Sequence, residues 1–492
     1  MVSGFRWFPG LFAGLLLAGG CGDGKDTDGP GGGVDSSLTA AGDLAVPSIT
    51  VDDDVIGVAI ASFTASYGGT AHIEYGLDSL DTSTPEYAVT SGEDVTIALL
   101  GLKGDQSYSA RLVLVEDGGE NHSSGSTSFD SPALPEDLPE FELIVPGEDG
   151  SCGVSGFVSV GMMSFSPSKP SWALIMDRDG DVVWGRREEQ ATIMRLRPAA
   201  DGESMLWSIA DVSRTEDNGW LVRESMATGE RSLTRLENHH HDFLQRPDGT
   251  IAWLSYDFGE YDYDEDGDLD DVASDIILED TEGAQSNEGA AEVFNMFQDY
   301  EHGVWDNGSS EANAFIPGYY DFSHGNSLMM SEDGDHYYIS FRWLDAIIKI
   351  ERSSGEVLWQ LGGDYDDFNL ADDDAFSHTH MSEMWEGGAL VFDNADETGR
   401  VSGAVEYSFD EESRTVEKVW EYRNEDGDFT SILGDAVRVS PDTCDEVLIA
   451  WSTRGRLQQL NRDYDTTWEI QTDLTGVVTG RVSVFDDIYT LR

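Results

Sequence analysis

Histidine is the side chain best suited to nucleophilic and acid–base chemistry near neutral pH, and it is unevenly distributed along this chain. Eight of the ten histidines lie between residues 239 and 380. Six of these eight form three groups, which are His239-His240-His241, His324, and His378 with His380. Each group comes just before an apolar stretch typical of a β-strand. We therefore expect the three groups to lie at equivalent places in the fold and to meet in one site.

Arg342 is a candidate anion-binding residue because it lies within the apolar stretch 337–344, which predicts a strand. Burying an unpaired guanidinium is costly, so a carboxylate or an anionic ligand should meet it. With 96 acidic residues in the chain, a structural salt bridge is one interpretation. The nearby histidines favour the other interpretation, in which Arg342 holds an oxyanion of a substrate.

The composition excludes several classes of function. The chain of 492 residues has 28 Lys and Arg against 96 Asp and Glu, a net charge of −68. Such a surface repels phosphate backbones and anionic lipids, so we expect no nucleic-acid partner. Hydrophobic residues make up 39% of the chain, enough for a large core. The length favours two or more domains.

The N-terminal residues predict export. Arg6 precedes the apolar run 8–17, and small residues lead to Cys21, so we expect a signal peptide over 1–21. The residues before Cys21 resemble a bacterial lipobox, which implies lipidation of Cys21; an ordinary signal peptide is the alternative. The Gly- and Asp-rich stretch 22–45 predicts a flexible tether. We expect an exported bacterial lipoprotein in the periplasm or at the cell surface, most simply anchored to the outer membrane and touching the membrane only through its lipid.

The stretch 46–131 contains short apolar strands separated by turn residues, a pattern typical of a β-sandwich. Residues 100–108, Leu-Gly-Leu-Lys-Gly-Asp-Gln-Ser-Tyr, resemble the fibronectin type III pattern, which implies that Tyr108 lies at a strand corner. This domain is expected to act as a spacer without chemistry of its own. A linker containing Pro132, Pro135 and Pro139 follows it.

From 142 to 492 a unit recurs in which a turn is followed by an apolar strand and often by a closing Trp. It ends at Trp184, Trp253 and Trp359, and more weakly at Trp420 and Trp468. These intervals suit four-stranded blades with inserted loops. We predict an all-β chain, an N-terminal β-sandwich followed by a six-bladed β-propeller, with a large irregular sandwich or a β-helix as the alternative. The innermost strands of a propeller surround a central channel, where the histidine groups would meet.

Two further features predict structural elements. Cys152 and Cys444 are an even pair in a chain expected to be exported, which favours a disulfide between the first and last blades. Alternating acids with a Gly at the sixth position match the first half of a calcium loop. These acids are Asp262, Asp264, Asp266, Asp268 and Asp270. We expect a structural calcium ion there; a solvated acidic loop is the alternative, because the usual twelfth-position Glu is replaced by Ala273.

Several of these stretches together resemble one family, the bacterial arylsulfotransferases that work without the nucleotide sulfate donor. The motifs lie within 238–395, and the resemblance spans about 150–490. They include His241-Asp242-Phe243, 321–327, 340–342, 346–350, 359–363, 376–380 and 392–394. The resemblance implies a six-bladed propeller that moves a sulfuryl group from a phenolic ester to another phenol through a sulfated histidine.

The resemblance also implies roles for single residues. His380 takes the place of the sulfated nucleophile, and His241, His324 and Arg342 match the residues that hold the sulfuryl oxygens. Asn326, His378 and His240 are expected beside the substrate. The family often has Gln-His-Asp where this chain has Thr379-His380-Met381, so His378 stays an alternative nucleophile.

The chemistry is reasonable apart from the resemblance. Sulfuryl transfer resembles phosphoryl transfer in its loose transition state, with charge spread over the equatorial oxygens, and a neutral imidazole can divide the displacement into two steps. We expect a phenolic sulfate donor, a phenol acceptor and no cofactor for the chemistry. One alternative is a non-catalytic binding or adhesion propeller. The other is a metal-dependent hydrolase with His378 and His380 on one face of a strand.

Overall fold

The computed structural model describes residues 43–147, 156–166, 168–189, 191–211, 219–309, 316–395, 400–423, 429–441, 443–474 and 477–491. Within these residues the chain is almost entirely β-structure, as predicted. The helices are the short α1 (Met296–Asp299) and the 3-10 turn η1 (Ser452–Arg454). Neither of these described helices has the length and apolarity that a membrane span requires.

Two sheets form an N-terminal sandwich. Its strands are β1 (Ser48–Val51), β2 (Ala59–Thr64), β3 (Gly69–Gly76), β4 (Thr82–Ser83), β5 (Tyr87–Val89), β6 (Asp94–Leu99), β7 (Ser107–Glu116), β8 (Asn121–Ser123) and β9 (Thr127–Asp130). One sheet has the order β1-β2-β6, and the other has the order β4-β3-β7-β8, with β5 on β3 and β9 on β7. Alternate residues of β7 are buried, because one face of the strand covers the core. The Tyr108 hydroxyl accepts a hydrogen bond from the backbone N–H of Lys103 at 2.8 Å, the arrangement of a tyrosine corner.

The described residues after 140 form six further sheets. Their strands are β10 (Phe141–Val145), β11 (Phe157–Met163), β12 (Ser171–Asp177), β13 (Val182–Glu188), β14 (Ala191–Pro198), β15 (Ser204–Asp211), β16 (Trp220–Ser225), β17 (Arg231–Arg235), β18 (His239–Gln245), β19 (Thr250–Tyr261), β20 (Asp270–Thr281), β21 (Ala291–Asn295), β22 (Tyr320–Asp321), β23 (Gly325–Met330), β24 (His336–Phe341), β25 (Ala346–Glu351), β26 (Val357–Gly362), β27 (Met381–Trp385), β28 (Gly388–Asp393), β29 (Gly403–Asp410), β30 (Thr415–Arg423), β31 (Asp435–Val439), β32 (Glu446–Trp451), β33 (Arg456–Leu460), β34 (Thr466–Thr472) and β35 (Val478–Phe485).

Each of the six sheets is an antiparallel meander. The orders are β14 to β17, β18 to β21, β23 to β26, β27 to β30, β31 to β34 with β10 added outside β34, and β35-β11-β12-β13. The short β22 joins β20 in parallel. Several second and third strands of these sheets are buried along nearly their whole length, as in β12, β28 and β32. Such strands read as continuous apolar runs, which explains why the sequence shows little alternation there.

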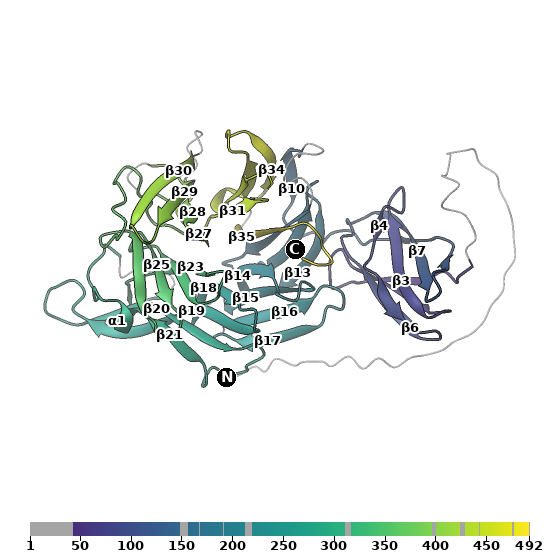
Figure 1. The fold of residues 1–492 in the computed structure, drawn as a ribbon, viewed down its shortest axis with the longest axis horizontal. Coiled ribbons are helices and arrows are strands. Elements are labelled where there is room, and N and C mark those ends of the chain that lie inside the picture. Colours follow the sequence, from purple (N-terminus) through teal and green to yellow (C-terminus); the bar gives the residue numbers. More distant parts are fainter. Residues whose placement is uncertain are drawn as a thin grey trace.

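The innermost strands contact one another in a closed circle (Figure 1). The circle runs β14, β18, β23, β27, β31, β35 and back to β14. Its last member, β35, comes from the end of the chain and pairs antiparallel with β11, with Val482 opposite Val160. The first and last parts of this region therefore share one sheet. This circular arrangement of sheets is a β-propeller, so the predicted propeller is confirmed.

The sandwich packs directly on the propeller. Val55 and Leu100 of the sandwich share one hydrophobic cluster with Trp184 of β13. The backbone N–H of Leu100 donates to the Tyr489 hydroxyl at 3.0 Å, and the Tyr75 and Tyr489 hydroxyls lie 2.8 Å apart. The contact joins apolar burial to buried hydrogen bonds, so the sandwich has a fixed place at one side of the propeller (Figure 1).

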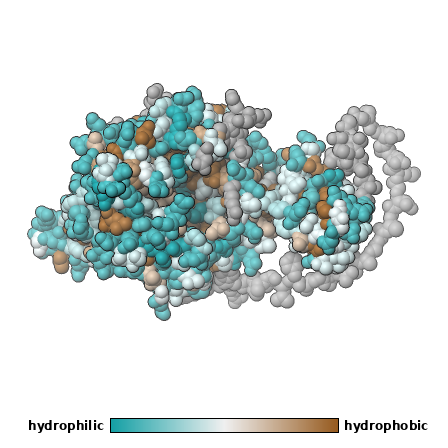
Figure 2. Space-filling view, in the orientation of Figure 1, coloured by the Kyte–Doolittle hydropathy of each residue, from teal (hydrophilic) through white to brown (hydrophobic). Residues whose placement is uncertain are grey.

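Hydrophilic residues cover most of the face seen in Figure 2. The exposed large apolar side chains are spread over many elements, among them Ile144 of β10, Phe258 of β19 and Val419 of β30. A surface of this kind follows from a net charge of −68, and single exposed apolar side chains are ordinary.

Several predictions fall on residues outside the described ranges. These are the signal peptide over 1–21, the lipidated Cys21, most of the tether 22–45, and Cys152. Cys444 lies between β31 and β32 and is disulfide-bonded. The lipid anchor and the pairing of Cys444 with Cys152 therefore stay predictions.

Lys103 joins the two domains electrostatically. Its Nζ lies 2.9 Å from Asp177, 2.7 Å from Asp179 and 2.7 Å from Asp181, on the turn between β12 and β13. One ammonium thus offsets the mutual repulsion of three carboxylates. Burial lowers the pKa of Lys103, but the hydrogen bonds to the three carboxylates more than offset it and raise the pKa above its ordinary value.

Replacing Lys103 by Met should weaken the interface between the domains. We expect Lys103→Met to lower the free energy of unfolding by about 1–2 kcal/mol at pH 7, because three carboxylates lose their shared cation. The loss should shrink below about pH 4, where these carboxyls become protonated. Urea unfolding at both pH values measures it, with exposed Lys169→Met as the control. Equal losses at pH 7 and pH 3 would contradict the electrostatic origin.

Candidate active site

The three histidine groups meet near the centre of the propeller. His241 lies in β18, His324 immediately precedes β23, and His380 immediately precedes β27. These are three consecutive innermost strands. The ring centroids of His241 and His324 are 4.8 Å apart, and those of His241 and His380 are 5.7 Å apart. The structure therefore brings together residues separated by up to 139 positions, the difference between 241 and 380.

Two of these histidines have an unusual backbone. The φ angles of His241 and His324 are +51° and +55°, a left-handed conformation that costs a non-glycine residue about 1–2 kcal/mol. Both lie at irregularities in strand pairing, between His239 and Phe243 in β18 and beside Gly325 in β23. Bulges of this kind change the direction of a side chain. The same device on neighbouring sheets brings the imidazoles of His241 and His324 against each other, and His241 also lies against His380.

A carboxylate helps to orient His240, the neighbour of His241 in β18. His240 Nε2 lies 3.1 Å from Asp275, while the Nδ1 atoms of His240 and His241 lie 3.0 Å apart. His240 also stacks on Tyr256 at 3.9 Å. Burial raises the pKa of Asp275, but the adjacent His240 and the hydrogen bonds that Asp275 accepts from the Ser323 hydroxyl and the Gly325 backbone N–H hold that pKa below its ordinary value. An ionised carboxylate, an imidazole and a second imidazole thus form a chain that ends in the site.

His324 has a carboxylate of its own. Asp321 Oδ2 accepts a hydrogen bond from the Nδ1 atom of His324. This bond engages Nδ1, with Nε2 on the opposite side of the ring. A carboxylate on one ring nitrogen is the usual way in which proteins set the tautomer of a catalytic imidazole.

His380 is buried and neutral at pH 7. Only 3% of its surface is exposed. Burial, together with the charges of Arg481, His324 and Arg342, lowers the pKa of His380 well below its ordinary value. Its Nδ1 has no hydrogen-bond partner among the described residues. The His380 backbone N–H donates to the carbonyl oxygen of Phe392 at 3.2 Å, which holds the residue at the start of β27.

The predicted strand position of Arg342 is wrong. Strand β24 ends at Phe341, and Arg342 lies half-buried in the turn that leads to β25. The turn returns the chain antiparallel to itself, and Asp345 adopts a φ of +48° to complete it. The apolar residues of the turn extended the pattern beyond the end of the strand. Arg342 nevertheless lies at the site, because its backbone N–H donates to the carbonyl oxygen of His324 at 3.0 Å.

His378 and His380 do not share the face of a strand. Both precede β27, and His378 has a φ of +50°. Its backbone N–H donates to Asp345 at 2.6 Å, and its ring meets the edge of Trp343 at 5.4 Å. The positive φ breaks the extended conformation that alternation on a strand requires. The strand-based metal site therefore lacks its geometry, and His380 is the member of the pair whose ring lies against His241.

Asn326 lies beside these residues and acts on the backbone. Its Nδ2 donates to the carbonyl oxygen of Thr379 at 2.9 Å, which ties β23 to the residue before His380. The sequence pattern predicts a contact with substrate. In the structure the amide nitrogen holds the backbone beside His380, and Asn326 Oδ1 has no hydrogen-bond partner among the described residues. The substrate contact stays a prediction.

Arg481 of β35 is a site residue that sequence reasoning missed. It is 3% exposed, its Nη1 lies 2.8 Å from Asp242 Oδ2, and its Nη2 donates to the carbonyl oxygen of Asn326. Its charge is the largest electrostatic contribution lowering the pKa of His380. The stretch around it, Val478–Phe485, is apolar. The argument applied to Arg342, a guanidinium inside an apolar strand, would have identified it.

Further buried charges surround Arg481. Arg197 Nη2 lies 2.9 Å from Asp242 Oδ1, and Arg195 Nη1 lies 3.6 Å from Asp435. Burial raises the pKa of Asp242, but the three guanidiniums hold it below its ordinary value. Burial and the neighbouring cations lower the pKa of Arg197 to about 9. Three guanidiniums thus face two carboxylates, which favours an added anion at this place.

Four acids of the predicted calcium loop lie between β19 and β20, and the fifth, Asp270, is the first residue of β20. Carboxylate oxygens of Asp262, Asp264 and Asp266 come within 4.8 Å of one another, and all three residues are exposed. Asp268 and Asp270 are not members of this group; Asp270 accepts a hydrogen bond from the backbone N–H of Tyr263 at 3.2 Å. Calcium binding stays a prediction. Among the described residues, none of the three groups with metal-binding geometry includes a propeller histidine.

Comparison with known families identifies the propeller. A family model described as "Arylsulfotransferase (ASST)" matches residues 158–453, which is more than half of the chain. The match includes all three histidine groups and Arg342. The chain belongs to the arylsulfotransferase family.

Other comparisons are less informative than this match. A search of curated proteins found no match. Similar solved structures include a nidogen/laminin complex (9% identity, TM-score 0.40, covering 68% of this chain and 100% of that chain). They also include the periplasmic gluconolactonase of Pseudomonas aeruginosa (12%, 0.36, 67% and 99%) and the Cps50 (Swd1) β-propeller domain of Myceliophteria thermophila (10%, 0.37, 71% and 89%). Because these TM-scores are below 0.5, the strand pairing of the arylsulfotransferase itself establishes its fold.

Removing the Arg481 guanidinium should destabilise the folded protein. We expect Arg481→Gln to lower the free energy of unfolding by about 3 kcal/mol, since breaking a buried ion pair leaves an uncompensated charge. The matched control is Arg187→Gln, whose exposed pairs with Asp137 and Glu189 should contribute less than about 1 kcal/mol. Denaturant unfolding measures both variants. Equal losses would show that burial of the Arg481 pair adds nothing.

Asp345 predicts a specific dependence of stability on pH. Burial raises its pKa to about 6, so from about pH 4 to 6 the folded protein binds a proton that the unfolded chain releases. Its contribution to the free energy of unfolding therefore falls as pH rises through this window. Asp345→Asn removes the contribution and keeps an oxygen for the His378 N–H.

The stability of Asp345→Asn relative to wild type should consequently increase from pH 4 to pH 6 and then level off above about pH 7. Urea unfolding of both proteins at several pH values measures the difference. A difference that is flat, or that falls over this range, would show that the carboxyl is not held in its neutral form.

Proposed function

We propose that this arylsulfotransferase moves a sulfuryl group from a phenolic sulfate ester to another phenol through a sulfohistidine at His380. The observation that carries the proposal is the state of His380, a buried, neutral imidazole. Its ring centroid lies 5.7 Å from that of His241, and the charges of Arg481 and Arg342 help to lower its pKa. Family membership supports sulfotransferase chemistry in general. The two-step route and the residue roles are our inference.

In the first step, the lone pair of a His380 ring nitrogen attacks the sulfur of the donor ester. The N–S bond forms while the S–O bond to the phenolic oxygen breaks, and the phenolate leaves with the electron pair. The leaving oxygen needs a proton, and His324 is arranged to donate it, because Asp321 holds the Nδ1 side of its ring. In the second step an acceptor phenol loses its proton to His324, attacks the sulfur and releases His380.

Charge on the sulfuryl oxygens must be stabilised in both steps. Arg342 supplies a guanidinium at the edge of the site. When His240 carries a proton on each ring nitrogen, its Nε2–H faces Asp275 and its Nδ1–H donates to Nδ1 of His241, so the proton of neutral His241 lies on Nε2, which then donates to a sulfuryl oxygen. Each such preorganised donor contributes roughly 3 kcal/mol to transition-state stabilisation. The guanidiniums of Arg481, Arg195 and Arg197 add a favourable potential for an anion from behind the site.

The test uses a chromogenic aryl sulfate with and without an added phenol. We expect wild type to release the chromophore in a phenol-dependent way, and His380→Ala to lose at least about a thousandfold in rate, because no other group replaces the nucleophile. His378→Ala is the matched control, two residues away, and should stay within about tenfold of wild type. Mass spectrometry without acceptor should find the sulfuryl group on a peptide containing residue 380.

Other outcomes would overturn parts of this proposal. Sulfation at His378 with activity retained in His380→Ala would reassign the nucleophile. Release that ignores the phenol and is abolished by a chelator would indicate a metal-dependent hydrolase. Inertness toward every aryl sulfate would indicate a binding propeller instead.

We further propose, from the N-terminal residues alone, that the enzyme is an exported lipoprotein anchored through Cys21. The spacer sandwich would then hold the catalytic propeller at a distance from the membrane surface. Anionic lipid and a protein of charge −68 repel each other, so a separate lipid anchor is needed for stable membrane attachment.

A further inference from the structure

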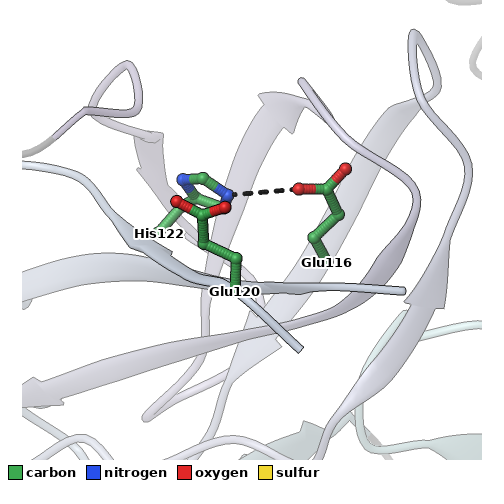
Figure 3. Close-up of side chains that lie close together, drawn as sticks. All are labelled: Glu116, Glu120 and His122. Carbon is green, nitrogen blue, oxygen red and sulfur yellow. Dashed lines mark ion pairs between the residues drawn. The ribbon is translucent and has the colours of Figure 1, made fainter. Parts of the chain in front are cut away.

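The N-terminal sandwich contains a compact group of metal-ligand side chains far from the histidines of the propeller. Atoms of Glu116, Glu120 and His122 all lie within 4.8 Å of one another. Figure 3 shows that they come from one hairpin, with the imidazole edge directed at the Glu116 carboxylate. From this arrangement we propose that the sandwich binds a divalent transition-metal ion, with zinc as the best fit.

The register of the hairpin places the three side chains on one face. Leu114 of β7 pairs with His122 of β8, and the backbone N–H of Glu116 donates to the carbonyl oxygen of Glu120 at 2.9 Å. Because alternate residues share a face, Glu116, Glu120 and His122 all project from the side that carries the fully buried Leu114. Two glutamates directly opposite each other repel, and a cation between them would remove that repulsion.

The buried imidazole is the observation that separates this group from an ordinary acidic patch. His122 is 7% exposed, and its Nε2 has no hydrogen-bond partner among the described residues. The nearest carboxylate oxygen, Oε2 of Glu116, is 3.6 Å away, which is too long for a hydrogen bond. A buried nitrogen without a hydrogen bond is costly. The 3.6 Å ion-pair separation between Nε2 of His122 and Oε2 of Glu116 would let both atoms bind one metal ion.

The other side of the ring is already fixed. Nδ1 of His122 lies 2.5 Å from Asp43, and the ring stacks on Tyr67 with centroids 4.3 Å apart. A carboxylate on one imidazole nitrogen, with the other nitrogen free, is the arrangement that orients most metal-bound histidines. Asp43 thus holds the Nδ1 proton and leaves the Nε2 lone pair for the metal.

The donor set decides the class of ion. One imidazole and two carboxylates suit zinc and related transition metals, whereas calcium and magnesium favour oxygen donors alone. Three protein ligands leave a coordination position for water. The site would cross-link the two strands of the β7–β8 hairpin to each other and, through Asp43, to the segment that precedes β1.

Zinc binding to the full chain, measured by equilibrium dialysis at pH 7.5, tests this proposal. We expect wild type to bind one zinc ion per chain tightly. The affinity for zinc should fall at least tenfold in Glu120→Gln and in His122→Ala. Asp43→Asn should weaken it about 10- to 100-fold, as loss of an orienting carboxylate does elsewhere. Glu86→Gln, an exposed acid of the same sandwich, is the matched control and should leave the affinity unchanged.

A second measurement guards against misfolding of the His122 variant. Glu120 is exposed, so Glu120→Gln should fold normally, and added zinc should raise the thermal stability of wild type but not of this variant. If Glu120→Gln and His122→Ala both still bind one zinc ion as tightly as wild type, the proposal is wrong. It is equally wrong if zinc binding is lost in His380→Ala and kept in Glu120→Gln, because the ion would then occupy the propeller.

Discussion

The ion pair between Arg481 and Asp242 connects the closure of the propeller to its chemistry. Arg481 lies on β35, the strand that completes the sheet begun by β11, while Asp242 follows His241 directly on β18. Until β35 takes its place, the Asp242 carboxylate, which is fully buried, would lack its Arg481 partner. The same guanidinium contacts the backbone of Asn326, and Asn326 in turn holds Thr379 beside His380. The Arg481 side chain thus contacts the residue that follows His241 and the residue that holds the backbone beside His380.

This dependence explains why so much charge is tolerated at the centre. Buried guanidiniums are costly one at a time, but Asp242 pairs with Arg195, Arg197 and Arg481, and Arg195 also pairs with Asp435. The excess is positive, which is unusual in a protein of charge −68. The general field of the molecule repels a sulfate ester, so only a local excess of positive charge can admit one. Stability and anion affinity therefore rest on the same guanidiniums.

The sequence predicted those features that depend on residues close together in the chain. The histidine groups lie at or just before the starts of innermost strands, and the apolar residues that follow them in the sequence predicted that position. The turn–strand–Trp unit indicated the propeller, although its members are not equivalent: Trp184, Trp359 and Trp420 lie on the outermost strands of their sheets, whereas Trp253 lies on the second strand of its sheet. A Trp can fill the space between sheets from either strand, so the unit reports a buried strand and does not say which one.

What the sequence could not supply are the contacts made by ring closure and by backbone geometry. Arg481 lies 101 residues beyond His380, and no local motif connects them. The left-handed conformations of His241 and His324 are equally invisible in the sequence, because only a small fraction of non-glycine residues adopt positive φ, even among types such as His that are enriched there. These backbone conformations nevertheless determine where the imidazoles lie. In a regular extended strand successive side chains alternate between faces, so His240 and His241 would point in opposite directions. The bulge and positive φ let His241 reach the site while His240 remains hydrogen-bonded behind it, so the strain at one backbone position produces both an active imidazole and its support.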